Sequence, residues 1–316
     1  MRKIVILDTL VNDTNLGNAF IMEAVHEVLN GIFPHDFIYH VPALEYVRAG
    51  RDMVRQANYI FLAGTNLLSS DMNSTSDWRL RITDMLWLKD VILLGVGWWQ
   101  YQAYPPNLYT RLLLKRVLSR EYYHSVRDSY TANKSKGLGF KVLNTGCPTV
   151  WGLTNDHCAG IPQDRAENAL LTFTEYSQCP KDDKLLFKIV ARNYRTVYFW
   201  PQMYGDYSYA KEICQNKVVF IDPSVKALDD FLQRQRVDCI GTRLHGGIRA
   251  LQHKRRTIIV GVDNRAIELG GDVNLPLVLR EKIALQLEDK INSSWSTEVR
   301  LDRQAINAWQ KQFNPF

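Results

Sequence analysis

The sequence lacks the features that mark secreted, membrane-spanning or metal-binding proteins. Its five cysteines are scattered and no two have C-x-x-C spacing, so we expect neither a disulfide framework nor a zinc site. No stretch approaches the ~18 consecutive apolar residues of a membrane span. The N-terminal MRKIVILDTL has too short an apolar run for a signal peptide and is typical of a first strand. These absences predict a cytoplasmic protein with free thiols.

Signatures of nucleic-acid binding and of repeats are also missing. There is no zinc finger, RNP-like aromatic pair, lysine-rich tail, fixed-period repeat or low-complexity tract, so no nucleic acid partner is predicted. The chain nevertheless has a net charge of +6 and a pI of about 9.0. A basic balance of this kind favours anionic ligands such as phosphates and nucleotides.

Short apolar runs alternate with helical patterns along all 316 residues. KIVILD, YIFLAG and VILLGVG are almost wholly apolar, which is typical of strands buried on both faces of a parallel sheet. After a polar stretch the alternation resumes with ALLTF, TVYFW, KVVFI, VDCIG and RTIIVGV. At ~150 residues per domain, the length predicts two domains as well. We therefore expect an α/β protein with two Rossmann-like, doubly wound domains that face a cleft.

The polar segment sets the expected domain boundaries. We predict an N-terminal domain over 1–155, a linker over 156–166, and a C-terminal domain over 167–296 that carries the ligand-binding loop. Residues 297–316 hold one more amphipathic helix. In sheets of this kind ligands bind at the carboxyl ends of the strands, so the loops there are the candidate sites.

The segment GTRLHGGIRAL, from Gly241 on, connects a predicted strand to a helix expected from Gly246. Gly246 and Gly247 let an anion approach the helix N-terminus, where N–H groups and the helix dipole favour negative charge. Arg243 can hold a phosphate or carboxylate through two parallel hydrogen bonds, and His245 can transfer a proton near neutral pH. The segment predicts an anion site with an acid–base group. The alternative is a surface turn whose arginine pairs with a carboxylate and whose histidine caps the helix.

Other predicted strands are also followed by small, polar or aromatic residues. Their alternative roles are ordinary helix capping for the asparagines and core packing for the tryptophans. The basic residues after the R-L-H-G-G segment are expected on a solvated helix face, and they are Arg249, Lys254, Arg255 and Arg256. The strand-end candidates are Asn15, Gly17, Asn18, Gly64, Thr65, Asn66, Trp98, Trp99, Arg127, Gln202, Tyr204 and Asp206.

Taken together, these segments resemble the polysaccharide pyruvyltransferase family over nearly the whole chain. The resemblance rests on the N-x-G-[D/N] turn from Asn15, the glycine turn at Gly64, SVRD at 125–128, and above all GTRLHGGIRAL followed by a strand and VDNR. It implies a GT-B-like fold whose last helix packs back on the N-terminal domain. It also implies transfer of the pyruvyl group of phosphoenolpyruvate to two hydroxyls of a sugar, which forms a cyclic ketal.

The resemblance implies that the donor is held by Arg127, Arg243, Leu244 and His245, and the strand-end positions and the chemistry of the reaction suggest further roles. His245 is the expected catalytic acid, and no metal or organic cofactor is expected, because phosphoenolpyruvate is itself the donor substrate. The residues that line the acceptor side are Asn15, Gly17, Asn18, Gly64, Thr65, Asn66, Trp98, Gln202 and Asp206. The residues expected to hold the donor are Arg127, Arg243, Leu244, Gly246, Gly247 and Arg265.

Alternatives of two other kinds stay open at this point. A sugar-nucleotide glycosyltransferase would use the same architecture and also a basic site. A non-catalytic protein of glycan synthesis is kept open by Asn18, which stands where the family has aspartate and cannot act as a base. The sequence leaves open the acceptor sugar, whether that acceptor is lipid-linked at the inner face of the membrane, and whether the chain forms a homo-oligomer.

Overall fold

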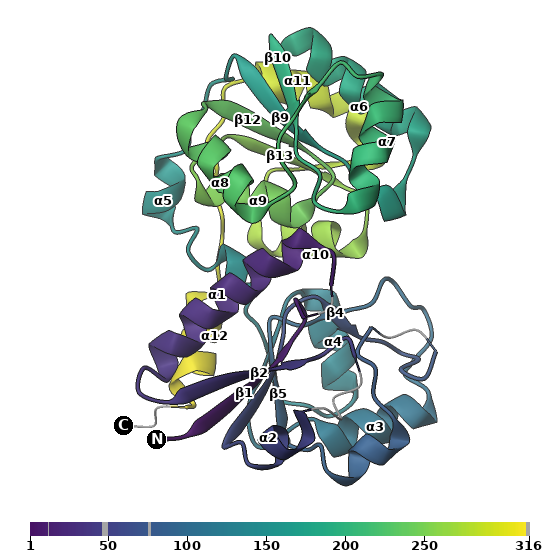
Figure 1. Cartoon of the computed structure of the whole chain (residues 1–316), viewed down its shortest axis with the longest axis vertical. Helices are drawn as coiled ribbons and strands as arrows, with labels where there is room; N and C mark the ends of the chain where they lie inside the picture. Colours follow the sequence, from purple (N-terminus) through teal and green to yellow (C-terminus); the bar gives the residue numbers. More distant parts are fainter. Residues whose placement is uncertain (12, 46–49, 75–76, 314–316) are drawn as a thin grey trace. The chain divides into compact units, whose positions relative to one another are not determined.

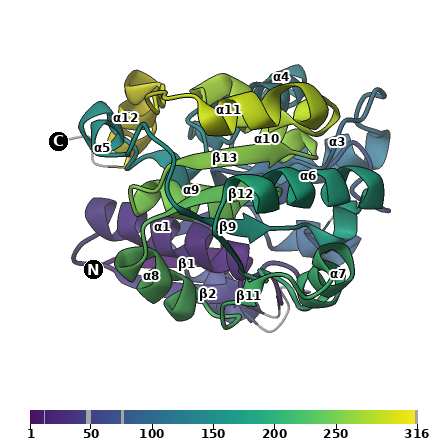
Figure 2. The same ribbon diagram turned by 90° about the horizontal axis from the view of Figure 1, so that it is seen from above.

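The chain divides into two compact units, which a computed structural model describes over residues 1–11, 13–45, 50–74 and 77–313 (Figures 1 and 2). Unit 1 comprises residues 1–13, 18–148 and 301–316, and unit 2 comprises residues 14–17 and 149–300. The first unit therefore ends at Pro148, before the boundary expected at residue 155. Within the described parts of the chain, no helix combines the length and the apolar character needed to cross a bilayer.

Unit 1 is built on a parallel sheet with the strand order β2-β1-β3-β5. A single bridge joins Val91 of β5 to Leu118, and another joins Val96 to Val126 of β7, which pairs with β8. Helix α1 covers one face, and α3 and α4 lie on the other (Figure 1). The elements are β1 (Lys3–Asp8), α1 (Leu16–Ile32), β2 (Phe37–Pro42), α2 (Arg51–Arg55), β3 (Tyr59–Ala63), β4 (Asn66–Leu68), η2 (Ile82–Leu86), β5 (Val91–Leu94), β6 (Gly97–Trp98), α3 (Leu108–Val117), β7 (His124–Val126), α4 (Ser129–Gly137), β8 (Val142–Asn144) and α12 (Arg303–Lys311).

The C-terminal helix α12 is anchored in unit 1 by aromatic rings. Phe313 lies 5.3 Å from Phe61 and 5.8 Å from Phe33, measured between ring centroids. Trp309 is fully buried and lies 6.0 Å from Phe61. Because such rings bury large apolar areas, this cluster joins Trp309 and Phe313 to β3 and to the residue that follows α1.

Residue His124 is a buried imidazole at the start of β7. Its Nδ1 accepts a hydrogen bond from the Leu93 N–H at 3.1 Å, and its Nε2 lies 2.9 Å from the Ser119 carbonyl. This arrangement fits the neutral ring with its proton on Nε2. Burial lowers the pKa of His124 to about 4, and the hydrogen bond to the Ser119 carbonyl offsets only part of that effect.

We expect the free energy of unfolding to fall on acidification because of this histidine. A histidine in the unfolded chain has a pKa of ~6.5. Below that pH the unfolded chain therefore binds a proton at this histidine, while the buried imidazole of the folded chain stays neutral. The contribution of His124 is complete above ~pH 6.5 and is lost between there and about pH 4, at roughly 1 kcal/mol per pH unit. Urea unfolding of His124→Gln between pH 4 and 7.5 should show a shallower acid dependence. The exposed His35→Gln serves as the control, and equal slopes for both variants would contradict the assignment.

Unit 2 contains a six-stranded, wholly parallel sheet with the order β11-β10-β9-β12-β13-β14. Numbered along this unit, the order is 3-2-1-4-5-6, that of the Rossmann fold. Helices α6 and α7 lie on one face, and α8 and α9 on the other (Figures 1 and 2). The elements are α5 (Asn155–Ala159), β9 (Asn168–Thr172), η4 (Glu175–Ser177), α6 (Pro180–Asn193), β10 (Thr196–Phe199), α7 (Tyr204–Cys214), β11 (Val219–Phe220), α8 (Val225–Arg234), β12 (Val237–Gly241), α9 (Leu244–Gln252), β13 (Thr257–Gly261), α10 (Asn264–Val273), β14 (Leu277–Leu279) and α11 (Glu288–Asn292).

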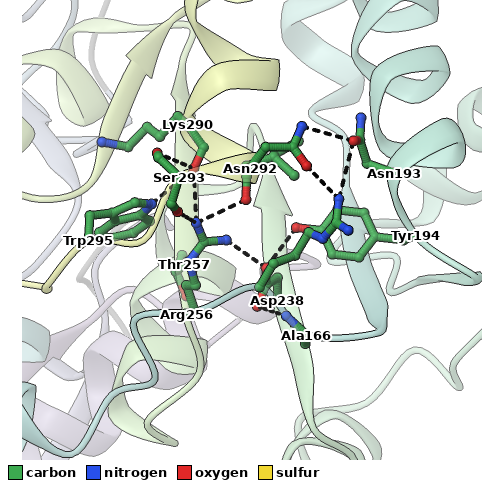
Figure 3. A network of polar contacts seen from close by, with 12 residues as sticks. Ala166, Asn193, Tyr194, Asp238, Arg256, Thr257, Lys290, Asn292, Ser293 and Trp295 are labelled. Carbon is green, nitrogen blue, oxygen red and sulfur yellow. Dashed lines mark hydrogen bonds and ion pairs between the residues drawn. The ribbon is translucent and has the colours of Figure 1, made fainter.

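Two of the four basic residues expected on a solvated helix face form structural contacts instead. Arg256 is buried, and its Nη1 donates to Asp238 Oδ2 at 2.8 Å (Figure 3). Its Nη2 donates to three carbonyls at the end of α11, and its guanidinium lies 4.8 Å from the Trp295 ring centroid. Arg249 forms two hydrogen bonds of 2.7 Å with Asp229. The expectation was wrong for these two arginines because carboxylates distant in sequence fold against them.

The two sheets are separate, as expected, but some boundaries differ. The predicted linker contains α5, whose N-cap Thr154 accepts from the His157 N–H at 3.1 Å. Helix α9 begins at Leu244, two residues earlier than expected, with Arg243 at the N-cap. Only two residues separate it from β12, so His245 lies in the first turn of the helix and not in a loop. That the two domains face one cleft stays a prediction.

Candidate functional site

The sheet of unit 2 reverses its strand order between β9 and β12. Ligands of doubly wound folds bind at this switch point, beyond the carboxyl ends of the strands. The two strands are exceptionally close there, because a Cβ on Gly241 would lie 2.3 Å from the Thr172 carbonyl oxygen. Only glycine fits this position, from which the chain passes directly to Arg243. The segments that follow β9 and β12 therefore form the candidate site in unit 2.

The side chain of Arg243 is buried and held by Asp206. Its Nε donates to Asp206 Oδ2 at 2.9 Å and to the Phe173 carbonyl at 3.0 Å, and its Nη2 donates to Asp206 Oδ1. Asp206 also accepts from the backbone N–H groups of Gln202 and Met203, both at 3.0 Å. The fork of the guanidinium is thus fixed by a carboxylate of α7, and Nη1 has no hydrogen-bond partner among the described residues.

Gln202 joins the N-terminal segment of the chain to the start of α9. Its Nε2 donates to Asn15 Oδ1 at 2.8 Å, and its carbonyl accepts from the Leu16 N–H at 3.1 Å. A Cβ on Gly17 would lie 2.6 Å from Gln202 Nε2, so glycine is needed for this approach. Gln202 Oε1 is buried without a hydrogen-bond partner in the described ranges, and a Cβ on Gly246 would lie 3.5 Å from it. An acceptor atom is therefore left beside the helix N-terminus.

Residue Tyr176, in η4 after β9, lies between two arginines. Its ring centroid is 4.9 Å from Arg243 Cζ and 5.4 Å from Arg265 Cζ. Arg265 Nη2 donates to the Tyr176 hydroxyl, and its Nε donates to Asp263 Oδ2 at 2.9 Å. Burial disfavours the charged guanidinium, but Asp263 and Tyr176 more than offset this and raise the pKa of Arg265. One ring thus brings together two arginines that lie 22 positions apart in the sequence.

The first turn of α9 contains the remaining residues predicted to meet the donor. Leu244, His245 and Gly246 lie in this turn, where backbone N–H groups are not used within the helix. His245 is largely buried, two positions from Arg243. Gly247 has a different role from the one expected. A Cβ on it would lie 2.8 Å from Ile259 Cγ1, so its absence allows α9 to pack on β13.

Arg127, which is predicted to hold the donor substrate, directly follows β7 in unit 1 and is buried. Its Nη2 donates to Asn66 Oδ1, and its Nε lies 3.5 Å from Asp128 Oδ2. A Cβ on Gly97 would lie 2.3 Å from Arg127 Nη2 and 2.4 Å from Asn66 Oδ1, so glycine makes room for the pair. The structure thus joins Arg127 to one of the residues predicted to line the acceptor side. That Arg127 and Arg243 hold one donor concerns both units and stays a prediction.

Asn18 lies in unit 1 beside a carboxylate. Its Nδ2 donates to Asp13 Oδ2, and the Thr9 carbonyl lies 3.4 Å from the same nitrogen. An amide donor suits this position, since an aspartate there would put two carboxylates in contact. Nearby, Gly64 and Thr65 follow β3 with φ angles of +67° and +46°. A Cβ on Gly64 would lie 2.2 Å from Ile21 Cγ2, so this turn permits glycine only.

Three buried residues predicted to line the acceptor side make contacts within their own units. Asp206 is held by Arg243, and Gln202 by Asn15 and Asp206. Trp98 lies in the hydrophobic core of unit 1 and donates from Nε1 to Gln102 Oε1 at 2.8 Å. Its ring therefore packs in the core, so stacking of a sugar on it is not supported. Asp206 positions Arg243, and Gln202 positions Asn15 through its Nε2, while Gln202 Oε1 has no partner in the described ranges.

Sequence reasoning missed Tyr176 and Gly97. Tyr176, which is half-exposed, follows the predicted strand ALLTF by a few residues, and the other strand-end candidates were selected on the same kind of signal. Gly97 was part of VILLGVG but was taken only as the end of a strand. Within the described ranges, no three His, Cys, Asp or Glu side chains are gathered as a metal site.

Comparison with known structures shows the fold. UDP-GlcNAc 2-epimerase of Methanocaldococcus jannaschii, in complex with UDP-GlcNAc and UDP, is 12% identical, with a TM-score of 0.56 and coverage of 98% of both chains. S. aureus MnaA with UDP is 12% identical, with a TM-score of 0.51 and coverage of 98% of this chain and 91% of that one. These likenesses support the expected GT-B-like fold of two Rossmann-like domains.

Sequence comparison places the chain in a family. A search among curated proteins gave no significant match. The family model of polysaccharide pyruvyl transferases matches residues 15–264, a span that includes Asn15, Arg127 and the whole of the segment around His245. Because this match covers most of the sequence, the chain belongs to the polysaccharide pyruvyl transferase family.

Proposed function

We propose that this transferase moves the pyruvyl group of phosphoenolpyruvate onto two hydroxyls of a sugar and needs no metal or organic cofactor. The observation that supports this best lies at the switch point of unit 2. There Arg243, the N-cap of α9, and Gln202, whose Oε1 lies beside Gly246, each have a buried side-chain atom (Arg243 Nη1 and Gln202 Oε1) without a hydrogen-bond partner among the described residues. The unpartnered donor atom suits an anionic oxygen of phosphoenolpyruvate, and the unpartnered acceptor atom suits a hydroxyl group of the sugar.

The proposed chemistry balances with one donor and one diol. A proton adds to the methylene carbon, the first hydroxyl oxygen bonds to the central carbon, and the carbon–oxygen bond to phosphate breaks. The second hydroxyl then bonds to the same carbon and closes the ketal. The two hydroxyls lose two protons, of which one equals the proton gained by the methylene carbon and the other leaves with hydrogen phosphate. His245 supplies the proton, and the arginines stabilise the departing phosphate.

The family implies a sugar or polysaccharide acceptor. We assign the acceptor side to the turns after β1 and β3, where Asn18, Gly64, Thr65 and Asn66 lie. Asp13 places a carboxylate against Asn18, so a base is at hand although the family's aspartate is replaced. This neighbour favours an active enzyme over a non-catalytic binding protein. We further propose that the protein acts in the cytoplasm, on the precursor of an exported polysaccharide.

Ligand-dependent thermal unfolding distinguishes the proposed donor from a sugar nucleotide. A ligand at 100 times its dissociation constant adds ~2.7 kcal/mol to the free energy of unfolding, which shifts the melting temperature measurably. We expect phosphoenolpyruvate to raise the melting temperature, and UDP- and GDP-sugars to leave it unchanged. The opposite pattern would favour a sugar-nucleotide glycosyltransferase, and a shift with phosphoenolpyruvate but no phosphate release with any glycan would favour a non-catalytic protein.

Replacement of Arg265 by glutamine should weaken the binding of phosphoenolpyruvate by about 1.5–3 kcal/mol, or ten- to hundredfold. The side chains of Arg265 and its partner Asp263 are half-buried, at 19% and 21% exposed, so the loss of Arg265 removes a cation without leaving a fully buried charge unpaired. Isothermal titration of the wild type and the variant measures the change. Arg195→Gln removes an exposed arginine that pairs with Glu167 and serves as the control. Equal affinities for the wild type and Arg265→Gln would remove Arg265 from the donor site.

Arg127 and Arg243 require more careful variants, because both are buried. Alanine at position 243 would leave Asp206 without its counter-ion and disturb the fold. The pair Arg243→Gln with Asp206→Asn keeps the site neutral and preserves hydrogen-bonding groups.

A further inference from the structure

One surface of unit 1 carries aliphatic side chains and positive charge together. Helix α3 buries Leu113, Leu114 and Val117, while Leu108 and Leu112, one turn apart on its outer face, are 72% and 56% exposed. In η2, Ile82 is 66% exposed and Leu86 is 79% exposed. Figure 1 shows α3 along the outside of unit 1. A set of four exposed aliphatic side chains on two elements indicates an interaction surface and not an accident of composition.

The two elements form one surface because a side chain of one is hydrogen-bonded to the backbone of the other. Arg116 Nε, from the last turn of α3, donates to the Met85 carbonyl in η2 at 2.9 Å. We call this surface the α3–η2 face and define it by Ile82, Leu86, Leu108, Leu112, Arg111, Lys115 and Arg116.

All exposed charges of these two segments are positive. Residues 79–89 and 108–120 contain seven exposed lysines and arginines. Their one acidic residue, Asp84, is buried and accepts from the Arg81 N–H at 2.8 Å. The exposed acidic residues nearest to these segments in the sequence lie outside them, at Asp77, Asp90 and Glu121. The basic residues are Arg79, Arg81, Lys89, Arg111, Lys115, Arg116 and Arg120.

We propose that the α3–η2 face docks on an anionic lipid bilayer. Its aliphatic side chains would enter the boundary between headgroups and acyl chains, while its arginines and lysines bind lipid phosphates. A second copy of the chain fits the face poorly, because a two-fold contact would oppose cation to cation. Nucleic acid would meet the charges but leave the leucines and isoleucine without partners, since bases stack on aromatic rings. A bilayer with negative charge uses both properties. This proposal does not depend on the pyruvyl-transfer reaction.

Flotation of the full chain with vesicles tests the proposal. The vesicles contain phosphatidylcholine alone or phosphatidylcholine with 30% phosphatidylglycerol. We expect at least tenfold more binding to the anionic vesicles and a loss of that binding as salt is raised. The double variant Leu108→Ser/Leu112→Ser should lower the vesicle affinity roughly tenfold, and Arg111→Gln/Lys115→Gln should lower it about as much. The changes lie on an exposed face, so thermal unfolding and phosphoenolpyruvate affinity should be unchanged.

Two control variants match the tested ones. Leu285→Ser removes a leucine of unit 2 that is 72% exposed, and Lys181→Gln/Lys184→Gln removes two exposed charges of α6. Neither should change vesicle binding. The proposal is overturned if the wild type does not bind anionic vesicles, or if the leucine variant binds as the wild type does. It is also overturned if sedimentation shows a dimer that the leucine variant dissociates, because a second copy would then cover the face. Donor affinity, measured on the same proteins, separates these outcomes from a failure of the proposed reaction.

Discussion

His245→Gln is expected to bind phosphoenolpyruvate within a few-fold of the wild-type affinity and to turn over at least ~100 times more slowly. Glutamine keeps a hydrogen-bond donor at the first turn of α9 but cannot transfer a proton. The positive end of this helix disfavours the protonated imidazole, but the bound trianionic donor favours it. The donor would have the larger effect, because it carries full negative charges close to the ring, whereas the helix dipole amounts to about half a charge. The proton would then be present when the methylene carbon needs it.

The same helix offers a matched control for this prediction. His253 lies at the C-cap of α9, and its Nε2 is 3.0 Å from Asp229 Oδ1. His253→Gln makes an identical chemical change at the opposite end of the helix. Single-turnover measurement of phosphate release should show a slow step in His245→Gln only. Normal turnover in that variant, or the same loss in both, would remove His245 from the reaction and leave an anion-binding turn.

The sheets could be predicted from the sequence because buried parallel strands are continuous apolar runs. KIVILD and VDCIG became β1 and β12 with nearly the expected limits, and both sheets are parallel. The carboxyl ends of these strands were therefore also predictable, and with them the position of Arg243. The two-residue connection from β12 to α9 was not, since it depends on how closely Gly241 approaches Thr172.

The partners of the site residues were beyond sequence reasoning. Asp206 pairs with Arg243 from 37 positions away, and Gln202 meets Asn15 from 187 positions away. Each contact depends on the order of strands in the folded sheet and not on a local pattern. Arg256 was expected on a solvated helix face, and it could be assigned to the core only once Asp238 had been located.

Arg256→Met is expected to lower the free energy of unfolding by about 3–5 kcal/mol at pH 7.5, because it leaves Asp238 buried without its counter-ion. Burial raises the pKa of Asp238, while the Tyr194 hydroxyl at 2.7 Å and Arg256 act against that rise. The variant also loses three hydrogen bonds to the end of α11 (Figure 3). Urea denaturation of the wild type and the variant measures the difference.

The pH dependence of this loss identifies its cause. Without Arg256 the pKa of Asp238 should rise further above its unfolded value, so the folded variant takes up a proton more readily than the unfolded chain. Its deficit against the wild type should therefore shrink as pH falls from 7.5 toward 5. The double variant Asp238→Asn/Arg256→Met should regain part of the loss at pH 7.5, since no buried charge remains. A deficit that does not vary with pH would instead assign the loss to the three carbonyl contacts alone.

The affinity for phosphoenolpyruvate should show that the network of Arg256 and Asp238 is independent of the candidate site. Asp238 is the second residue of β12, and Arg256 directly precedes β13, so both lie at the edge of the sheet opposite the loop that carries Arg243. Arg256→Met, once folded, should bind the donor as the wild type does. The neighbouring Arg255→Met removes a side chain that donates to the Leu232 carbonyl at 2.9 Å and should cost only about 1 kcal/mol. A weaker donor affinity in folded Arg256→Met would show that the strand ends of unit 2 shift together.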